Sequence, residues 1–241
     1  MGPTQSAMAA DTKRKIQVPR QTEKALKQTT WGGAHIAGND WSFYTGTSAA
    51  LFSHGWRVRL IGGYSSYSYQ RTQNVSGQST PVKFKGQSGF GDILLGYRWK
   101  TGDFILKAFA GIHGVGHAVI PFDPENAAIG YQYGGMTALE IWLNVSERHW
   151  LSADASYATV FNRFDTTIRT GYRLWPKLSL GLEAGLSGND DYIAARAAGM
   201  AAAEFSLFAK DDSYLRVSAG GSADRDMDLS PYAAVSFAVK Y

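Results

Sequence analysis

Five histidines are the first candidates for chemistry, because a neutral imidazole can act as a general base or bind a metal ion. None of them lies in a recognisable nucleophile motif. His113 and His117 share one face of a single predicted strand, so together they could reach a serine or a metal ion. Polar residues near a strand end are the simpler interpretation, and we predict no catalytic residue, no metal site and no cofactor. The five are His35, His54, His113, His117 and His149.

Three acidic residues, Glu140, Asp154 and Glu183, are the second candidates. Hydrolysis of a glycosidic bond needs two carboxyl groups about 5 to 10 Å apart. The three acids lie on different predicted strands, and ion pairing with arginines inside a shared interior explains them more simply. We therefore interpret them as structural charges.

The elements that position these residues are predicted β-strands. After Thr30 the chain repeats segments of about ten residues in which apolar and polar side chains alternate, with turn residues between them. No apolar run approaches the ~20 residues that a membrane helix needs. The predicted strands are 30–38, 41–52, 56–71, 83–99, 104–120, 130–145, 150–161, 163–175, 178–189, 192–209, 213–222 and 231–241.

The links between these strands differ in length at the two ends of the sheet. The links 53–55, 101–103, 146–149, 176–177 and 211–213 are all short and fall on one side. The links 72–82, 121–128 and 224–230 fall on the other side and are the longest, although 39–40 and 162 are tight. Short periplasmic turns and longer outer loops are typical of outer-membrane barrels. The sequence thus predicts an all-β, up-and-down antiparallel barrel of about 12 strands that spans a bacterial outer membrane.

Aromatic residues at the strand ends favour this barrel over a soluble sandwich, whose strands would alternate in the same way. Membrane barrels carry aromatic belts at both interfaces. Trp150, Trp175 and Tyr214 fall on the polar parity, so either a bulge shifts them or they plug the periplasmic mouth. The belt near the short turns is predicted to contain Trp56, Trp99, Phe104 and Tyr241, and the opposite belt Tyr64, Tyr67, Tyr69, Tyr131, Tyr133 and Tyr192. The terminal aromatic also resembles the signal by which barrel-assembly machinery recognises its clients.

Charged residues on the polar parity should point into the barrel. Charges in a confined interior must pair or hold water, because isolated burial costs several kcal/mol per ion. A barrel of this size lies between side-chain-filled and channel-forming barrels, and we favour a constricted, charge-paired lumen. The predicted lumen network contains Arg57, Arg59, Asp92, Arg98, Lys107, Glu140, Asp154, Arg169, Arg173, Glu183, Arg196, Glu204 and Arg216.

The net charge of +4 lies entirely near the N-terminus, where the first 29 residues hold six basic and two acidic residues. Residues 1–28 are predicted to be a flexible, basic periplasmic tail, and residues 29–241 the barrel. Nucleic-acid binding is not indicated. Ala7-Met8-Ala9 resembles the small-x-small end of a signal peptide, so we interpret the start as truncated or engineered.

A set of motifs in order along the chain carries a family resemblance. They include Gly55-Trp56-Arg57-Val58-Arg59, Leu95-Gly96-Tyr97, Ala108-Phe109-Ala110-Gly111, Asp123-Pro124, Ala153-Asp154-Ala155-Ser156-Tyr157, Gly171-Tyr172-Arg173 and Asp190-Asp191-Tyr192 followed by Arg196. From about residue 31 to the end, the chain resembles the BcsS family of cellulose biosynthesis proteins. The resemblance implies a role beside the cellulose synthase and export machinery, with no catalytic or ligand residues to carry over. Gly181-Leu182-Glu183 departs from the Gly-Pro-Glu run expected there.

These observations favour a non-enzymatic outer-membrane barrel that assists the secretion or anchoring of cellulose or another exopolysaccharide. Its expected partners are outer-membrane lipid, the polysaccharide and its secretion machinery. A small-solute or oligosaccharide porin and a lipid-modifying enzyme are the two alternatives. Aromatic platforms in a continuous lumen would favour sugar passage, and a histidine beside a serine or carboxylate at the lipid-facing rim would favour an enzyme.

Overall fold

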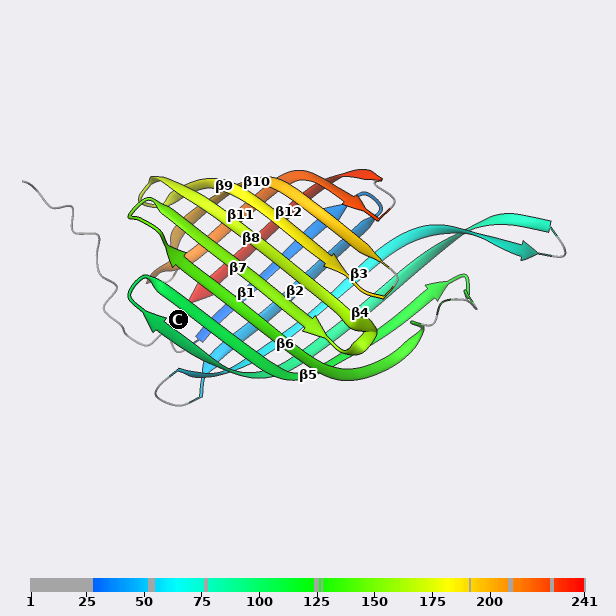
Figure 1. The fold of residues 1–241 in the computed structure, drawn as a ribbon, viewed down its shortest axis with the longest axis horizontal. Coiled ribbons are helices and arrows are strands. Elements are labelled where there is room, and N and C mark those ends of the chain that lie inside the picture. The colour runs from blue at the N-terminus through cyan, green and yellow to red at the C-terminus, as the bar shows by residue number, and fades with distance from the viewer. Residues whose placement is uncertain are drawn as a thin grey trace, which may run out of the picture.

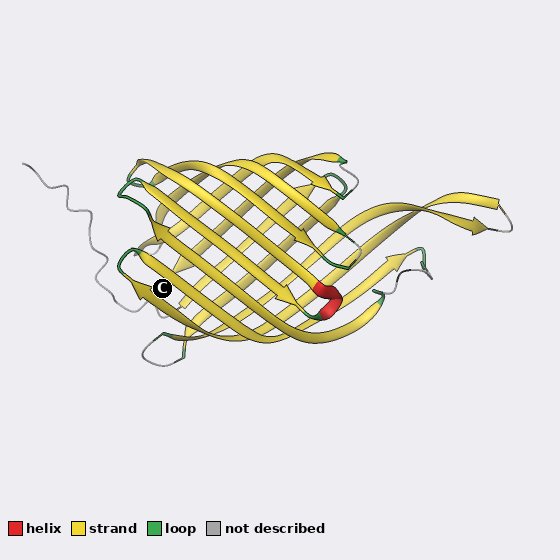
Figure 2. Ribbon diagram, viewed as in Figure 1, coloured by secondary structure: helices red, strands yellow, loops and turns green. Residues whose placement is uncertain are grey.

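The computed structural model describes residues 28–51, 55–75, 78–123, 126, 128–190, 192–207, 210–225 and 228–240. These residues form one closed barrel in which each strand pairs antiparallel with its sequence neighbours and the last strand pairs with the first (Figure 1). Figure 2 shows that nearly all of it is strand. The strands are β1 (Gln28–Ala37), β2 (Asp40–Ala50), β3 (Trp56–Val75), β4 (Gln78–Thr101), β5 (Phe104–Ile120), β6 (Gly130–Asn144), β7 (His149–Ala158), β8 (Arg163–Trp175), β9 (Leu178–Gly188), β10 (Ile193–Leu207), β11 (Lys210–Asp224) and β12 (Leu229–Lys240).

The predicted twelve-strand, up-and-down topology is confirmed. Closure depends on the pairing of β1 with β12, which runs from Thr29 opposite Lys240 to Ala37 opposite Tyr232. Because a closed sheet leaves no unpaired edge, every strand can satisfy its backbone within the barrel. A three-residue 3-10 turn, η1 (Val160–Asn162), joins β7 to β8. Among the described residues, no helix has the length and apolar composition to cross a membrane.

The longest strands depart from the prediction at one end of the barrel. The segment 72–82, predicted as a loop, is mostly strand, because β3 continues to Val75 and β4 begins at Gln78. Pairing with β2 ends where Trp41 lies opposite Ser66, and pairing with β5 ends where Lys85 lies opposite Ile120. Residues 67–75 and 78–84 therefore form a two-stranded ribbon that projects beyond the barrel (Figure 1).

A second difference concerns the link predicted at Asp211 to Ser213. These residues belong to β11, which begins at Lys210 and already pairs with Leu207 there. The strand therefore begins three residues earlier than predicted. Acidic residues at the end of a strand gave a turn signal, but β11 extends past them, with a register shift between the Ser213–Phe205 and Lys210–Leu207 pairs.

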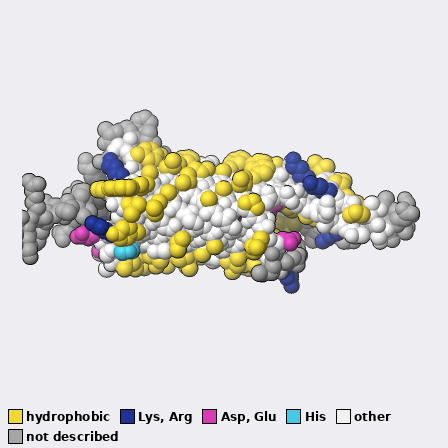
Figure 3. Space-filling model, turned by 90° about the horizontal axis from the view of Figure 1, so that it is seen from above, with side chains coloured by type: hydrophobic (Ala, Val, Ile, Leu, Met, Phe, Trp, Pro, Cys, Tyr) yellow, Lys and Arg dark blue, Asp and Glu magenta, His cyan; other side chains and the backbone are white. Residues whose placement is uncertain are grey.

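The two faces of the sheet differ in the way that membrane barrels require. Outward positions carry exposed apolar side chains, such as Ile93 (63% exposed) and Leu182 (65%). The adjacent inward positions Asp92 and Glu183 are only 3% and 5% exposed. Apolar side chains cover much of the flank in Figure 3. This arrangement is the inverse of a soluble protein and matches a sheet surrounded by lipid.

Candidate functional site in the barrel interior

The interior is built by one parity of each strand, and neighbouring strands bring charges of that parity into register. Arg98 of β4 lies opposite Lys107 of β5, which lies opposite Glu140 of β6, which in turn lies opposite Asp154 of β7. This row runs along the hydrogen-bonding direction of the sheet. The thirteen charged residues predicted for the lumen all occupy inward positions, but they divide into separate groups.

Arg59 of β3 is the residue that joins the most distant walls. Its Nη1 donates to Glu140 Oε1 at 2.6 Å, and its guanidinium lies 5.2 Å from the ring centroids of both Trp31 and Phe109. Lys107 Nζ donates to the other carboxylate oxygen of Glu140 at 2.7 Å. Trp31 is on β1 and Glu140 on β6, which are five steps apart in a ring of twelve strands. The Arg59 cluster therefore crosses the interior.

Arg169 of β8 organises the second group. Its guanidinium pairs with Asp154 of β7, and its Nε donates to Glu183 Oε2 at 2.6 Å. Tyr232 of β12 donates its hydroxyl to Glu183 Oε1 at 3.0 Å. Glu183 is therefore held from both sides although it is almost fully buried. Charge-assisted hydrogen bonds of this kind offset the desolvation of the ions.

Arg196 of β10 belongs to a third group that the sequence analysis covered only in part. It pairs with Asp165 at 3.3 Å and donates to the hydroxyl of Thr167. Asp165 was not among the predicted lumen residues. It shares the parity of Arg169 on β8, so the alternation that identified Arg169 could also have identified it.

Asp92 and His113 form a buried pair toward the end of the barrel that carries the ribbon. His113 Nδ1 lies 2.6 Å from Asp92 Oδ1, and each residue is 3% exposed. His117, on the same face of β5, contacts the hydroxyl of Tyr67 at 2.7 Å and the carbonyl of Ala128 at 3.1 Å. The partners of the two imidazoles are thus a carboxylate, a phenol and a backbone carbonyl, and not the serine that a catalytic pair would need. In the described part of the chain, no group of three or more histidine, cysteine, aspartate or glutamate residues could hold a metal ion.

The remaining predicted lumen residues do not join these groups. Arg57 donates to the hydroxyl of Ser48 at 3.0 Å, and Arg173 donates to Asn144 Oδ1 at 2.8 Å near the rim with the short turns. Neither Arg57 nor Arg173 forms an ion pair with a residue that the structure describes. Three further inward residues form neither an ion pair nor a side-chain hydrogen bond with the described residues: Arg98, Glu204 and Arg216. The charge pairing is therefore dense in the middle of the barrel and sparse toward this rim.

The aromatic residues near the short turns occupy the outward face. Trp56 contacts Tyr97 at 5.4 Å between ring centroids, Tyr97 contacts Trp99 at 4.7 Å, and Phe104 is exposed. Tyr241 lies outside the described residues. These rings are placed where a periplasmic interface belt would lie.

The opposite belt differs from the prediction in its members. Tyr131 and Tyr133 are 83% and 77% exposed, as a belt requires. Tyr67 and Tyr69 instead point to the inner side of the ribbon, where their rings stack with each other. They share the odd-numbered, inward parity of Arg57 and Arg59 on β3, whereas Tyr64 has the outward parity. Trp41 and Phe43, which the sequence analysis did not include, contact Tyr64 on the outward face.

The three aromatic residues that fall on the polar parity occupy different positions in the structure. Trp150 points inward, is 5% exposed and stacks on Trp142 at 4.7 Å. Trp175 follows a register shift after Arg173 and pairs with Leu178, so a bulge brings it to the outward face. Tyr214 keeps its inward position opposite Ala238.

The base of the ribbon is held by a small polar and aromatic cluster. Tyr69 donates its hydroxyl to Asp123 Oδ2 at 2.6 Å, and Arg71 Nη1 lies 3.6 Å from the same oxygen. Asp123 is fully buried, and Phe84 stacks on Tyr69 at 5.1 Å. Burial, together with the hydrogen bond to Asp123, raises the pKa of the Tyr69 phenol. The ribbon and the segment after β5 are thus fixed to each other.

Taken together, the closed sheet, its apolar outer face and its charged interior define a transmembrane β-barrel of the outer-membrane class. The family model described as cellulose biosynthesis protein BcsS matches residues 27–241. The chain therefore belongs to the BcsS family, as the sequence resemblance predicted. No curated protein matches the chain.

Three solved structures with a similar fold are distant in sequence. The translocator domain of the autotransporter NalP from Neisseria meningitidis has a TM-score of 0.52 and 11% identity, covering 90% of both chains. The transport unit of the autotransporter AIDA-I from Escherichia coli has a TM-score of 0.50 and 12% identity, covering 94% of both chains. The KdgM porin in complex with disordered oligogalacturonate has a TM-score of 0.50 and 9% identity, covering 88% of this chain and 99% of that chain. At these identities the likeness shows the fold alone.

Proposed function

We propose that this barrel spans the bacterial outer membrane and assists the secretion or anchoring of cellulose or a related exopolysaccharide without being its main conduit. It acts without catalysis, through its outer surface and its contacts with the secretion machinery. The family supports the association with cellulose, and the Arg59 cluster that crosses the interior supports the non-conducting role.

The orientation follows from the two ends of the barrel. Short turns such as Gly102-Asp103 and Pro176-Lys177 lie at one end, which we assign to the periplasm. The ribbon and residues 121–123 then face the outside. An outer surface with a tall projection suits contact with a polymer that has already left the cell, and the periplasmic end suits contact with the export machinery.

The interior argues against threading of a polymer. A glucan chain would have to break the contacts of Arg59 with Glu140, Trp31 and Phe109, which come from four strands. The Arg59–Glu140 pair is partly buried, so breaking it should cost more than the ~1 kcal/mol of an exposed pair and less than the ~3 to 5 kcal/mol of a fully buried one. Such a barrier would slow the continuous passage of sugars, so it argues against a conduit.

The cellular test is deletion of the gene in a cellulose-producing strain, followed by complementation. We expect the deletion to reduce cell-attached or secreted cellulose, and both the wild type and Glu140→Gln to restore it. Glu140→Gln changes the crossing ion pair but leaves the outer surface intact. Unchanged cellulose in the deletion strain would contradict the proposal. If the Glu140→Gln barrel is present at normal levels but does not restore cellulose, the lumen is the functional site.

The basic segment 1–28 is proposed to be a periplasmic tail that contributes little to the barrel. Nearly all of it lies outside the described residues. It contains few apolar residues for packing and a proline that interrupts any helix. Deleting residues 1–28 should leave heat resistance in detergent nearly unchanged, and a large loss would show that the tail stabilises the barrel as a plug.

An oligosaccharide pore is the second candidate, and one observation favours it. Arg98, Glu204 and Arg216 point inward without an ion pair among the residues described, which indicates water in the periplasmic half of the lumen. Conductance separates the two candidates, because a pore needs that water to continue past Arg59.

A further inference from the structure

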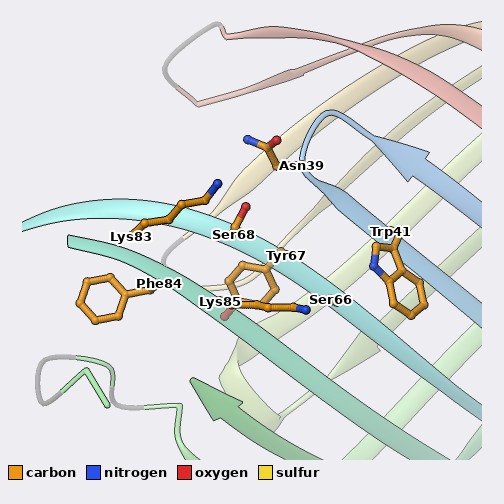
Figure 4. A pocket seen from close by; sticks show the side chains of 8 residues that line it. All are labelled: Asn39, Trp41, Ser66, Tyr67, Ser68, Lys83, Phe84 and Lys85. Carbon is orange, nitrogen blue, oxygen red and sulfur yellow. The ribbon is translucent and has the colours of Figure 1, made fainter. Parts of the chain in front are cut away.

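A cavity lies on the outer flank of the barrel, where the ribbon rises beside the turn between β1 and β2 (Figure 4). Its volume is about 390 Å³. Lys85 extends across it toward Trp41, and Lys83 extends along the ribbon past Ser68, whereas Phe84 points the other way. Its lining consists of Asn39, Trp41, Ser66, Tyr67, Ser68, Lys83, Phe84 and Lys85.

The charge of this cavity favours an anion. Lys83 and Lys85 are exposed, and neither ammonium forms an ion pair with any residue in the described part of the chain. Ser66 and Ser68 add hydroxyl groups, and Asn39 adds an amide. Ammonium and hydroxyl donors that converge on one space suit an oxyanion such as phosphate. Figure 3 shows basic side chains gathered where the ribbon leaves the barrel.

The height of the cavity matches lipid headgroups. Lys83 and Lys85 share the outward parity of Ile93 and Leu95, so they leave the outer face of β4, above the lipid-facing part of the sheet. Just below the cavity, Trp41 contacts Tyr64 at 5.6 Å between ring centroids. Aromatic belts of this kind mark the boundary between hydrocarbon and headgroups.

The distance from the belt to the lysines can be estimated from the strand. Tyr64 lies opposite Gly89, and Lys85 precedes Gly89 by four residues on β4, toward the ribbon. This separation is ~13 Å along a strand and ~10 Å along the membrane normal at a tilt of ~40°. A headgroup layer is ~5 to 8 Å thick. Because a lysine side chain can bend toward the interface, the ammonium of Lys85 reaches the level of lipid phosphates.

We propose that this cavity is a binding site for the phosphate-bearing headgroup of an outer-leaflet lipid, with Lys83 and Lys85 on the phosphate and Trp41 beside the upper acyl chain. The proposal rests on the outer-membrane location proposed above. A lipid held here would fix the angle at which the ribbon leaves the membrane surface. It would thus orient the surface that we assign to the polymer.

The test measures lipid retention by the folded full-length barrel in detergent, using native mass spectrometry with phosphatidylglycerol as the probe and phosphatidylcholine as the comparison. We expect preferential retention of phosphatidylglycerol. Lys83→Gln with Lys85→Gln should weaken that binding about tenfold or more, since hydrogen bonds to charged groups are lost. Lys83→Arg with Lys85→Arg should retain it, and Lys100→Gln with Lys177→Gln, at the opposite rim, should change it less than about twofold.

Other outcomes would overturn the proposal. Equal retention of the two lipids, or unchanged binding in the Lys83→Gln, Lys85→Gln variant, would show that the cavity does not select phosphate. Displacement of the lipid by millimolar inorganic phosphate would assign the site to a free anion, and displacement by cello-oligosaccharides would assign it to the polymer. Because the assay uses detergent, a barrel that fails to insert into vesicles would contradict the proposed function without affecting this result.

Discussion

β3 and β4 run through both the barrel and the projecting ribbon, but their polar residues have different surroundings in the two regions. Inside the barrel, Arg59 of β3 finds partners on β1, β5 and β6. In the ribbon, β3 and β4 pair with each other, and a cluster around Asp123 holds the base. Closure of the sheet therefore supplies the partners that allow charge to be buried.

The difference also explains how each region holds its shape. An isolated two-stranded hairpin is marginally stable in water. The ribbon is stabilised where Tyr69, Phe84 and Asp123 form a small core of their own. The barrel is held by twelve paired strands, by interior ion pairs and by a small apolar cluster of Leu94, Phe109 and Ala138. We expect the two regions to respond separately to mutation.

The largest effect is expected for Glu183→Ala in the interior. The change removes an acceptor of Arg169 and of Tyr232, and it should lower the free energy of unfolding by about 3 to 5 kcal/mol if the site is dry. Urea unfolding in detergent micelles measures this value. Glu204→Ala is the matched control, because Glu204 is inward but exposed and makes no ion pair with the described residues; it should cost less than about 0.5 kcal/mol. A loss below about 1 kcal/mol for Glu183→Ala would indicate a water-filled site.

A smaller and local effect is expected for Asp123→Ala at the ribbon base. The hydroxyl of Tyr69 and the guanidinium of Arg71 lose a shared acceptor, which costs about 1 to 3 kcal/mol of local stability. Limited trypsin digestion should then cleave the ribbon about tenfold faster. Heat resistance of the barrel should stay unchanged, and the exposed ribbon variant Gln70→Ala should behave as wild type. Equal destabilisation of barrel and ribbon by Asp123→Ala would show that they form one cooperative unit.

The smallest effect concerns the titration of Tyr69, whose pKa is raised above 10.0 by burial and by its hydrogen bond to Asp123. The neutral phenol is the form that donates this bond. Its stabilising contribution should therefore be complete below pH 10.0 and be lost as the pH rises through the raised pKa. The tyrosinate absorbance of wild type minus Tyr69→Phe measures this ionisation. An ionisation at the ordinary pKa of tyrosine would show that the ribbon base is open to water.

Much of the fold could be predicted, because alternation and turn asymmetry are local properties of the sequence. Strand number and closure followed from them. The ribbon could not be predicted in this way. Its residues between Thr72 and Val82 are polar on both faces, so no alternation distinguishes strand from loop, and backbone pairing beyond the barrel determines the outcome. Backbone pairing with β10 likewise explains why β11 begins earlier than predicted.

For the site, the sequence predicted inward positions better than partners. Alternation assigned Arg59 and Glu140 to one face of their strands, but they are separated by 81 positions in sequence. Their contact depends on the stagger and diameter of the closed barrel, which no local pattern encodes. Asp165 could have been included by parity alone. Tyr67 and Tyr69 were assigned to the outer belt although they share the inward parity of Arg57 and Arg59, so parity alone could have excluded them.

Electrical conductance of the purified barrel in a planar bilayer tests the central claim most directly, namely that paired charges cross the interior at Arg59. We predict a small conductance that cello-oligosaccharides do not change. The double variant Arg59→Ala, Glu140→Ala should raise it, because the contacts between distant walls are removed. A large, steady conductance of the wild type that falls when cello-oligosaccharides are added would contradict the account and identify the barrel as a sugar-conducting channel.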